Sequence, residues 1–223
     1  MSSNFINTLK GKGLYWYVEV LSKTCRFHTE GVEELKDVMN SGKPLIVTSW
    51  HGAQMMLIGS MRKFLDGNSF ITIFPDDYRG DILRTYVSSL GIEATLLNLG
   101  GDTTFEMSRK LIQVIRQISD GKNFVIFPDG PEGPAYIVKS GLTFIARKTE
   151  AYIVPVGCYC RKAYHIPRWD RFTLPVPFCK IHVQIGKPFT VSKEQSDFDE
   201  VNHHLEDTLN RAGAQAAANY YEL

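Results

Sequence analysis

The sequence predicts a three-layer αβα domain with a mostly parallel central sheet and an N-terminal helical arm. Short apolar runs rich in β-branched residues alternate along the chain with longer segments of helical periodicity. Connections of helical length between strands are crossovers, which place successive strands parallel with helices on the faces of the sheet. The 223 residues, 43% of them hydrophobic, suffice for one large core, and no linker interrupts the pattern. We therefore expect a helical arm at residues 1–30 and one α/β domain at residues 31–223.

The arm carries aromatic and basic side chains on a mixed helical face. They are Phe5, Ile6, Leu9, Tyr15, Trp16 and Val20, interleaved with Lys10, Lys12, Lys23 and Arg26. This composition suits the headgroup layer of a membrane, and equally a helix that docks on the domain or on another subunit. No apolar run approaches the roughly 20 residues that span a bilayer as a helix. We expect a chain that lies against a membrane without crossing it.

The elements of the domain follow from periodicity and from the glycines and prolines that punctuate it. We predict helices at residues 31–39, 53–65, 79–90, 103–119, 141–148 and 198–218, and strands at residues 44–49, 70–74, 94–97, 124–127, 152–160 and 180–186.

Charge and cysteine usage exclude some classes of protein. The 25 basic and 24 acidic residues nearly cancel, so the broad positive field of a nucleic-acid-binding protein is absent. The four cysteines form no CxxC pair. Cys158 and Cys160 fall on one face of a predicted strand and are expected to pack as reduced thiols. With no signal peptide, a reducing, cytoplasmic compartment is expected.

Reactive side chains follow three of the predicted strands. His51 comes after the first, Asp76 and Asp77 after the second, and Asp129 after the strand at 124–127. Ligands of open α/β sheets bind at the carboxyl ends of strands, so these residues are expected to face one crevice. Aspartates at such ends also cap helices, which is the alternative for each of them.

His51 is the strongest single candidate for a catalytic residue. A histidine at a strand-to-helix turn, followed by Gly52, lies near the positive end of a helix, which favours the neutral imidazole that a general base requires. The alternative is a histidine that hydrogen-bonds its own turn. His51 is therefore a candidate base and, equally, a candidate structural residue.

The loop that follows the strand at 124–127 is rich in glycine and proline. Its sequence is Pro128-Asp129-Gly130-Pro131-Glu132-Gly133-Pro134. The glycines allow a backbone to approach a ligand closely, and the prolines stiffen the loop. Lys139 then opens a helix whose N-terminus could bind an anion such as a phosphate.

Several motifs in order resemble the lysophospholipid acyltransferase superfamily. They are Trp50-His51-Gly52, Arg79-Gly80-Asp81, Phe127 to Pro134, and Ile153-Val154-Pro155-Val156-Gly157. More narrowly, the chain resembles an uncharacterised bacterial branch with Trp-His-Gly and Pro-Asp-Gly-Pro-x-Gly-Pro motifs. Trp169-Asp170-Arg171-Phe172 and the prolines up to Phe178 are similar to that branch too. The resemblance covers about residues 44–189.

The resemblance implies transfer of a fatty acyl group from a thioester to a hydroxyl of a lysophospholipid or related lipid, with His51 as general base. The family pattern is His-x4-Asp, but the residue here is Met56, which cannot hold an imidazole. Asp129, Asp77 or Asp81 could supply the carboxylate, and Asp129 is our first choice; a backbone carbonyl is a further possibility.

The resemblance also implies where substrates bind and which partners the chain has. Substrate contacts are expected at Arg79, Gly80, Gly130, Pro131, Glu132, Gly133 and Lys139. Acyl-coenzyme A or acyl carrier protein would be the donor, with no cofactor and no metal. We expect peripheral attachment to the inner face of the membrane. Residues 164–178 are predicted to form an irregular loop, which either touches lipid or admits an acyl chain, or else packs back on the sheet. Oligomeric state is left open.

Two other classes of function compete. One is a catalytically weak relative that binds lipid or an acyl carrier without transferring anything, which Met56 favours. The other is a hydrolase or phosphotransferase that holds a divalent metal on Asp76, Asp77 and Asp129. The G-x-S-x-G elbow of serine hydrolases and the Walker A and G-x-G-x-x-G nucleotide motifs are all missing from the sequence.

Overall fold

A computed structural model describes residues 3–64, 70–97 and 105–222. The helices are α1 (Ser3–Thr24), α2 (Val32–Asn40), η1 (His51–Ala53, one 3₁₀ turn), α3 (Gln54–Phe64), α4 (Tyr78–Ser89), α5 (Phe105–Ser119), α6 (Ser140–Thr149) and α7 (Phe198–Glu222). The strands are β1 (Arg26–Glu30), β2 (Leu45–Thr48), β3 (Phe70–Pro75), β4 (Glu93–Leu97), β5 (Asn123–Ile126), β6 (Tyr152–Tyr159), β7 (Ala163–His165), β8 (Thr173–Pro175) and β9 (Lys180–Ile185). Residue 65 and residues 103–104, which belong to two of the predicted helices, lie outside the described residues.

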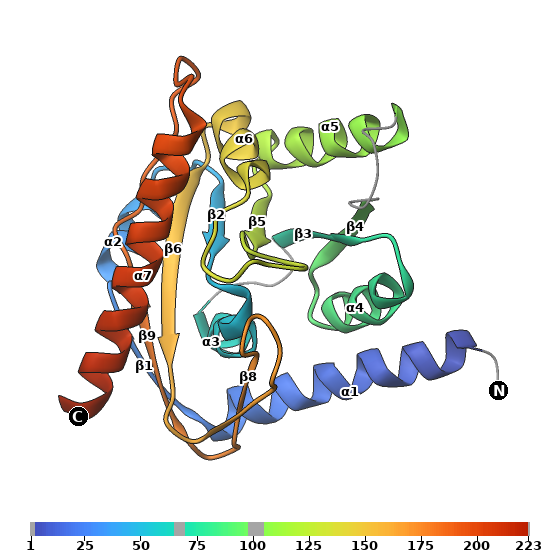
Figure 1. The fold of residues 1–223 in the computed structure, drawn as a ribbon, viewed down its shortest axis with the longest axis vertical. Coiled ribbons are helices and arrows are strands. Elements are labelled where there is room, and N and C mark those ends of the chain that lie inside the picture. The colour runs from blue at the N-terminus through green and yellow to red at the C-terminus, as the bar shows by residue number, and fades with distance from the viewer. Residues whose placement is uncertain (1–2, 65–69, 98–104, 223) are drawn as a thin grey trace.

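The central sheet has seven strands in the order β1-β9-β6-β2-β5-β3-β4 (Figure 1). Each pair of neighbours runs parallel except β6 and β9. The predicted fold class, a mostly parallel sheet between helical layers, is therefore confirmed.

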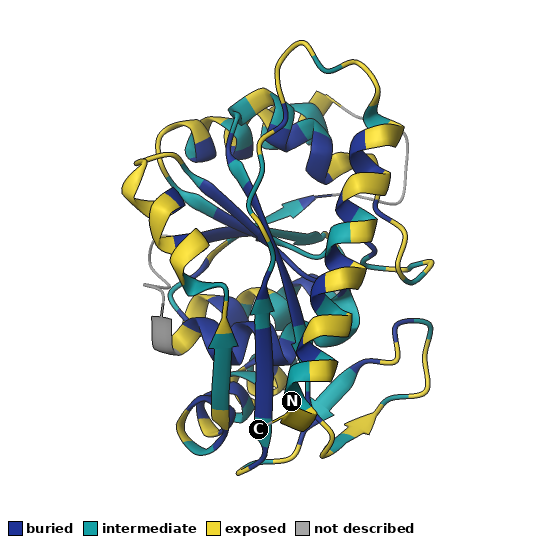
Figure 2. Ribbon diagram, turned by 90° about the vertical axis from the view of Figure 1, so that its left-hand side faces the viewer, coloured by how far each residue is buried: buried dark blue, intermediate teal, exposed yellow. Residues whose placement is uncertain are grey.

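Alternate side chains of the strands enter two cores, one on each face of the sheet. In β2, Leu45 and Val47 point to the core covered by α1, α2, α3 and α4, while Ile46 points to the core covered by α5, α6 and α7. All four residues of β2 are buried, as expected for a strand covered on both faces. Figure 2 shows the central strands mostly dark blue, whereas other strands are teal and yellow, and the outer sides of the helices are yellow. Full burial of each such side chain contributes about 1.5–3 kcal/mol.

The N-terminal segment differs from the prediction of one helix over residues 1–30. The helix ends at Thr24, and β1 forms the edge of the sheet, parallel to β9. The sequence of β1 is Arg-Phe-His-Thr-Glu, which contains no apolar run that would predict a strand. Its extended conformation depends on pairing with β9. α1 lies along α3 and α4 (Figure 1), and at Gly11 a Cβ atom would come within 2.6 Å of the Ile82 carbonyl oxygen. In the described residues, no helix is long and apolar enough to cross a membrane.

Residues 164–178 also differ from the irregular loop that we predicted. β7 and β8 form an antiparallel hairpin, with Ala163 opposite Pro175 and His165 opposite Thr173. The tip of the hairpin, residues 166–172, is closed by a hydrogen bond from the Ile166 amide to the Phe172 carbonyl at 2.9 Å. A three-residue strand carries too little periodicity to be recognised in the sequence.

Candidate active site

His51 and Asp129 lie side by side because they follow adjacent strands by the same number of residues. Thr48 pairs with Ile126 at the ends of β2 and β5, and three residues further on the same register brings His51 to Asp129. The Asp129 Oδ1 accepts a hydrogen bond from the His51 backbone N–H at 2.9 Å, and its Oδ2 accepts one from the Tyr136 N–H at 3.3 Å. Asp129 therefore ties the turn after β2 to the loop after β5.

The imidazole of His51 is held by Asp170 and not by Asp129. His51 Nδ1 lies 2.7 Å from Asp170 Oδ2, and the Asp170 side chain is fully buried. This corrects our first choice of carboxylate. The physical reason is that backbone amides occupy both oxygens of Asp129, whereas the tip of the β7–β8 hairpin folds over the end of β2 and brings Asp170 to the ring.

Arg168 neutralises Asp170 through a bidentate ion pair. Its Nε donates to Asp170 Oδ1 at 2.6 Å and its Nη2 donates to Oδ2 at 2.7 Å. The Phe172 backbone N–H also donates to Oδ1, at 3.3 Å. Burial alone would raise the pKa of Asp170, but the hydrogen bonds from Arg168 and His51 outweigh it and hold this pKa below its usual value. Asp170 is thus a carboxylate, which can accept the Nδ1–H of a neutral ring.

His51 lies in an aromatic enclosure that keeps it neutral. The ring centroids of Phe127, Trp169 and Phe172 lie 5.9, 5.4 and 5.9 Å from that of the imidazole. Burial lowers the pKa of His51 below its ordinary value, against the opposing hydrogen bond and charge of Asp170. The sequence predicted a lowered pKa from the helix end; burial is the leading cause. With Nδ1–H bonded to Asp170, the Nε2 lone pair is the basic site of the ring.

Three glycines allow the segments around His51 to pack this closely. A Cβ atom at Gly52 would lie 2.2 Å from the Asp170 carbonyl oxygen, one at Gly130 2.7 Å from His51 Cδ2, and one at Gly133 2.8 Å from the Trp169 ring. The loop at 130–134 therefore packs on His51 and on Trp169 of the hairpin tip, and the tip itself packs on the turn at Gly52. The two loop glycines thus let the backbone approach the side chains of His51 and Trp169, and their approach to a ligand stays a prediction.

Two other residues that we expected to bind substrate already have partners. Arg79 donates to Asp77 Oδ2 at 2.6 Å and to Glu132 Oε1 at 3.1 Å. The Lys139 ammonium donates to the Gly130 carbonyl oxygen at 3.0 Å. Arg79 and Lys139 thereby link the loop to its neighbours.

The remaining predicted residues are placed as follows. The Gly80 N–H donates to Asp77, the N-cap of α4. Pro131 and Pro134 follow cis peptide bonds. Met56 is buried on α3 among the apolar side chains of the core.

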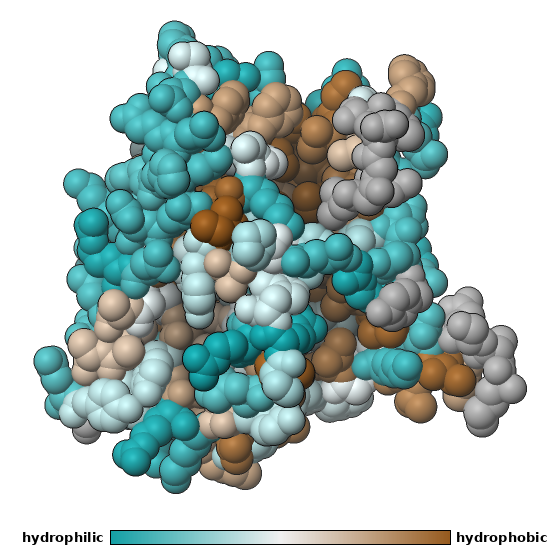
Figure 3. Space-filling view, in the orientation of Figure 1, coloured by the Kyte–Doolittle hydropathy of each residue, from teal (hydrophilic) through white to brown (hydrophobic). Residues whose placement is uncertain are grey.

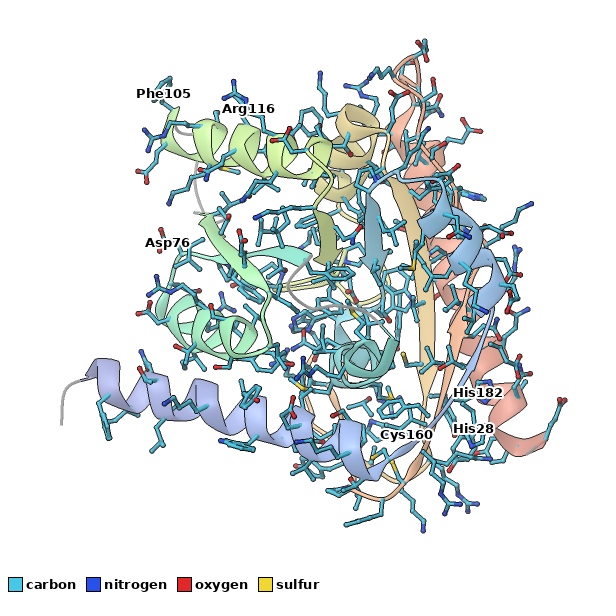
Figure 4. All side chains as sticks on the ribbon, turned by 180° about the vertical axis from the view of Figure 1, so that it is seen from behind. His28, Asp76, Phe105, Arg116, Cys160 and His182 are labelled. Carbon is cyan, nitrogen blue, oxygen red and sulfur yellow. The ribbon has the colours of Figure 1, made fainter. Side chains whose placement is uncertain are left out.

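The three carboxylates of the metal-dependent alternative serve separate elements. Asp76 is half-exposed and lies 3.6 Å from the Lys110 ammonium, whereas Asp77 caps α4 and Asp129 binds backbone amides. Figure 4 shows Asp76 at the outer surface near α4. Within residues 3–64, 70–97 and 105–222, no group of three or more His, Cys, Asp or Glu side chains is placed to hold a metal ion.

The remaining sulfur and imidazole groups lie apart from His51. All four cysteines are free, and Cys160 contributes to a buried cluster with Cys25 and Cys179. His28 and His182 stack at the β1–β9 edge of the sheet (Figure 4). We find no role for either group at the site.

A narrow apolar pocket adjoins the imidazole. Its cavity volume is about 20 Å³, and it lies between α3, α4 and strands β3 and β5. Phe127, which packs on His51, forms one of its walls. The other walls are Gln54, Ile58, Thr72, Phe74, Leu83, Tyr86, Val87, Ile92 and Val125.

Comparison with known proteins places the fold. None of the known protein-family models matches the chain. It is 28% identical over 196 residues to the uncharacterized protein RP090 of Rickettsia prowazekii (strain Madrid E), a match that covers 86% of this chain and 83% of that protein. The crystal structure of the 1-acyl-sn-glycerophosphate (LPA) acyltransferase PlsC from Thermotoga maritima is similar at a TM-score of 0.57 and 20% identity, over 96% of this chain and 80% of that one. The chain therefore has an acyltransferase-like fold.

The sequence contained one signal for Asp170 that we did not use. It is the single acidic residue between Arg161 and Lys180, a stretch that holds several basic side chains. A lone carboxylate among cations is a natural ion-pair partner. The sequence does not say which cation pairs with Asp170 or that the pair lies beside His51, because the hairpin decides both.

Proposed function

We propose that the protein transfers a fatty acyl group from a thioester donor to a hydroxyl of a lysophospholipid or related lipid, with His51 as general base. The observation that carries the proposal is the His51–Asp170 pair, 2.7 Å between Nδ1 and Oδ2, at the carboxyl end of β2 in this fold. The likeness to PlsC supports the fold, and the motifs around His51 support the reaction class.

In the proposed reaction the acceptor hydroxyl gives its proton to Nε2 of His51 as its oxygen bonds to the thioester carbonyl carbon. Asp170 stabilises the imidazolium that forms. When the tetrahedral intermediate collapses, the carbon–sulfur bond breaks and the leaving thiolate takes the proton back from Nε2. The His51 imidazole ends the cycle in the protonation state in which it began, so the proposed reaction uses only the two substrates and the side chains of the site.

We propose that the acyl chain enters at the apolar pocket, whose walls must move apart to admit it because the cavity measures only about 20 Å³. Its lining is mostly apolar, and it begins at Phe127, beside the imidazole. A thioester carbonyl placed at His51 would therefore have an apolar space next to it. Acyl-coenzyme A and acyl carrier protein present the same thioester to this space, and both are candidate donors.

A lipid acceptor requires access to a membrane, and α1 offers a surface for it. Leu9 and Trp16 are 63% and 61% exposed on one face of α1, and Phe5 and Val20 continue the same stripe. Hydrophobic side chains are visible along α1 in Figure 3. Exposed apolar residues beside lysines suit the interfacial layer of an anionic membrane. We propose that α1 rests on the bilayer.

Asp170 also bears on the binding-only alternative. That alternative was favoured by Met56, which leaves the His-x4-Asp pattern without its acid. A carboxylate from the hairpin tip, that of Asp170, lies 2.7 Å from Nδ1 of the ring, which supports its use in place of that acid. The missing acid at residue 56 is then no reason to expect an inactive site.

The experiment uses purified protein with labelled acyl-coenzyme A and acyl-carrier-protein donors and a panel of lysolipids. His51→Ala is compared with His203→Ala, which removes an exposed histidine of α7. Acylated lipid from the native protein and from His203→Ala, lost in His51→Ala, is the expected result. Absence of product with every pair, in a protein that folds normally and is presented with vesicles, would refute the proposed function.

A further inference from the structure

The Asp170 carboxylate is shared by two side chains. Its Oδ2 meets both His51 Nδ1 and Arg168 Nη2 at 2.7 Å, while its Oδ1 accepts from Arg168 Nε at 2.6 Å. Both oxygens therefore accept a hydrogen bond from the same guanidinium. A fork of two parallel N–H donors defines the orientation of a carboxylate, which a single charge does not.

Arg168 is itself held in the site. Its guanidinium carbon lies 5.0 Å from the centroid of the Phe172 ring, and the same ring packs on His51. Its Nη2 lies 3.5 Å from His51 Nδ1. Arg168, Asp170 and His51 thus form one compact group against Phe172, although two of them come from the hairpin tip and one follows β2.

We infer that Arg168 is a positioning residue for His51: it locks the Asp170 carboxylate in the place and plane in which Oδ2 meets Nδ1 of the imidazole. The inference rests on the proposed function, because it assigns Arg168 a part in the same proton transfer. It does not make Arg168 a group that touches the substrate.

The charges around His51 give Arg168 a second effect. The charged groups that face the ring are Asp170 and Arg168 from the hairpin tip and Asp129 from the loop after β5. The two carboxylates favour the imidazolium, and Arg168 opposes it, so the positive charge of Arg168 helps to keep the pKa of His51 low. Removal of that charge should raise the pKa of His51 and free Asp170 to rotate.

An alternative role can be separated by experiment. The Arg168 side chain is 41% exposed, so it could instead contact an anionic substrate group. A substrate contact made equally in ground state and transition state changes KM, whereas a residue that acts through the base changes kcat. A substrate contact would also leave the titration of the free protein's histidine unaltered.

The test compares native protein with Arg168→Gln and Arg168→Lys by two readouts. The first is the titration of His51, followed by NMR of protein labelled in its histidine rings and assigned through the signal missing in His51→Gln. The second is the pH profile of kcat and KM for acyl transfer with the donor and acceptor found active. Thermal unfolding of each variant shows whether it is folded.

We expect Arg168→Gln to raise the titration midpoint of His51 and to lower kcat roughly 10- to 100-fold with little change in KM, as for other orienting partners. Arg168→Lys keeps the positive charge but lacks the two parallel N–H donors. It should therefore restore the titration midpoint of His51 more fully than it restores kcat. An unchanged His51 midpoint in both folded variants, or a rise in KM alone, would overturn the inference. If native protein transfers no acyl group, the proposed function fails, and the NMR titration still decides the role of Arg168.

Discussion

Asp170 Oδ2 lies 2.7 Å from His51 Nδ1, although 119 residues separate the two in the chain. The contact depends on two different parts of the fold. His51 is placed by the end of β2, and Asp170 by the tip of the β7–β8 hairpin. Gly52 permits the two backbones to meet, because any side chain at residue 52 would strike the Asp170 carbonyl.

Replacement of the orienting carboxylate should slow acyl transfer strongly. Asp170→Asn keeps the size of the side chain but turns one oxygen into a donor and removes the charge that stabilises the imidazolium. We expect kcat to fall by about 10²- to 10⁴-fold, the upper value being that of a triad whose Asp becomes Asn. Asp199→Asn, an exposed change in the first turn of α7, is the control and should leave kcat unaltered. Equal rates for Asp170→Asn and native protein would refute the role of Asp170.

The pH dependence of acyl transfer should reflect a histidine that stays neutral at pH values below the ordinary histidine pKa. Burial lowers the pKa of His51, so kcat/KM should hold steady as the pH falls to about 6.5 and drop only below it. Asp170 opposes that shift, so the residual activity of Asp170→Asn should have its acid limb at a still lower pH. The measurement is kcat/KM against pH for both proteins. An acid limb above the ordinary histidine value would contradict a base of lowered pKa.

Gly130 should be needed for the position of His51. Gly130→Ala places a Cβ atom 2.7 Å from His51 Cδ2, so the ring or the loop must shift. Misplacement of a base by about 1 Å can cost about 10²-fold, and we expect a loss of that order in kcat. Gly213→Ala, in the middle of α7, is the matched control, since a Cβ atom there meets nothing within 4 Å. It should add about 0.5–1 kcal/mol to the free energy of unfolding because alanine favours a helix. Similar activity in both variants would count against the close packing around His51.

Much of the architecture could be predicted from the sequence because the central strands are covered on both faces. β2, β5 and β6 read as apolar runs, and the residues that follow β2 and β5 could be placed at one edge of the sheet. What escaped prediction is decided by tertiary contacts. β1 and the β7–β8 hairpin are short and carry polar residues, so neither has the periodicity of a strand.

The same limit applies to the candidate site. Asp129 could be placed beside His51, since two parallel neighbours preserve register, but whether it meets the ring or the backbone depends on the turn geometry. Asp170 lies on a segment whose basic and aromatic composition suggested lipid contact. Its partner could not be named until the fold showed where the hairpin tip lies.

A carboxylate at residue 56 should raise neither the rate of acyl transfer nor the stability of the protein. Met56 is buried among the apolar side chains of the core. Met56→Asp would bury an unpaired charge, which costs about 3–5 kcal/mol, and the His51 ring already has its carboxylate. We expect a clear fall in the unfolding midpoint and no gain in transfer rate. Met56→Leu, which conserves volume, should cost less than about 1.5 kcal/mol. A faster Met56→Asp enzyme would show that the acid position of the family pattern is still in use.

Membrane attachment through α1 should depend on its exposed apolar stripe. Leu9 and Trp16 are more than half exposed, and insertion of each into the interfacial layer should contribute roughly 0.8–1.5 kcal/mol, about half the value for full burial. The double variant Leu9→Ala, Trp16→Ala should therefore bind vesicles containing phosphatidylglycerol at least about tenfold more weakly, since about 1.4 kcal/mol is a factor of ten. Co-sedimentation with the vesicles measures it. Met39→Ala, which removes a half-exposed apolar side chain from α2, is the control and should bind as native protein does. If both proteins lose binding equally, or neither does, α1 is not the membrane-binding surface.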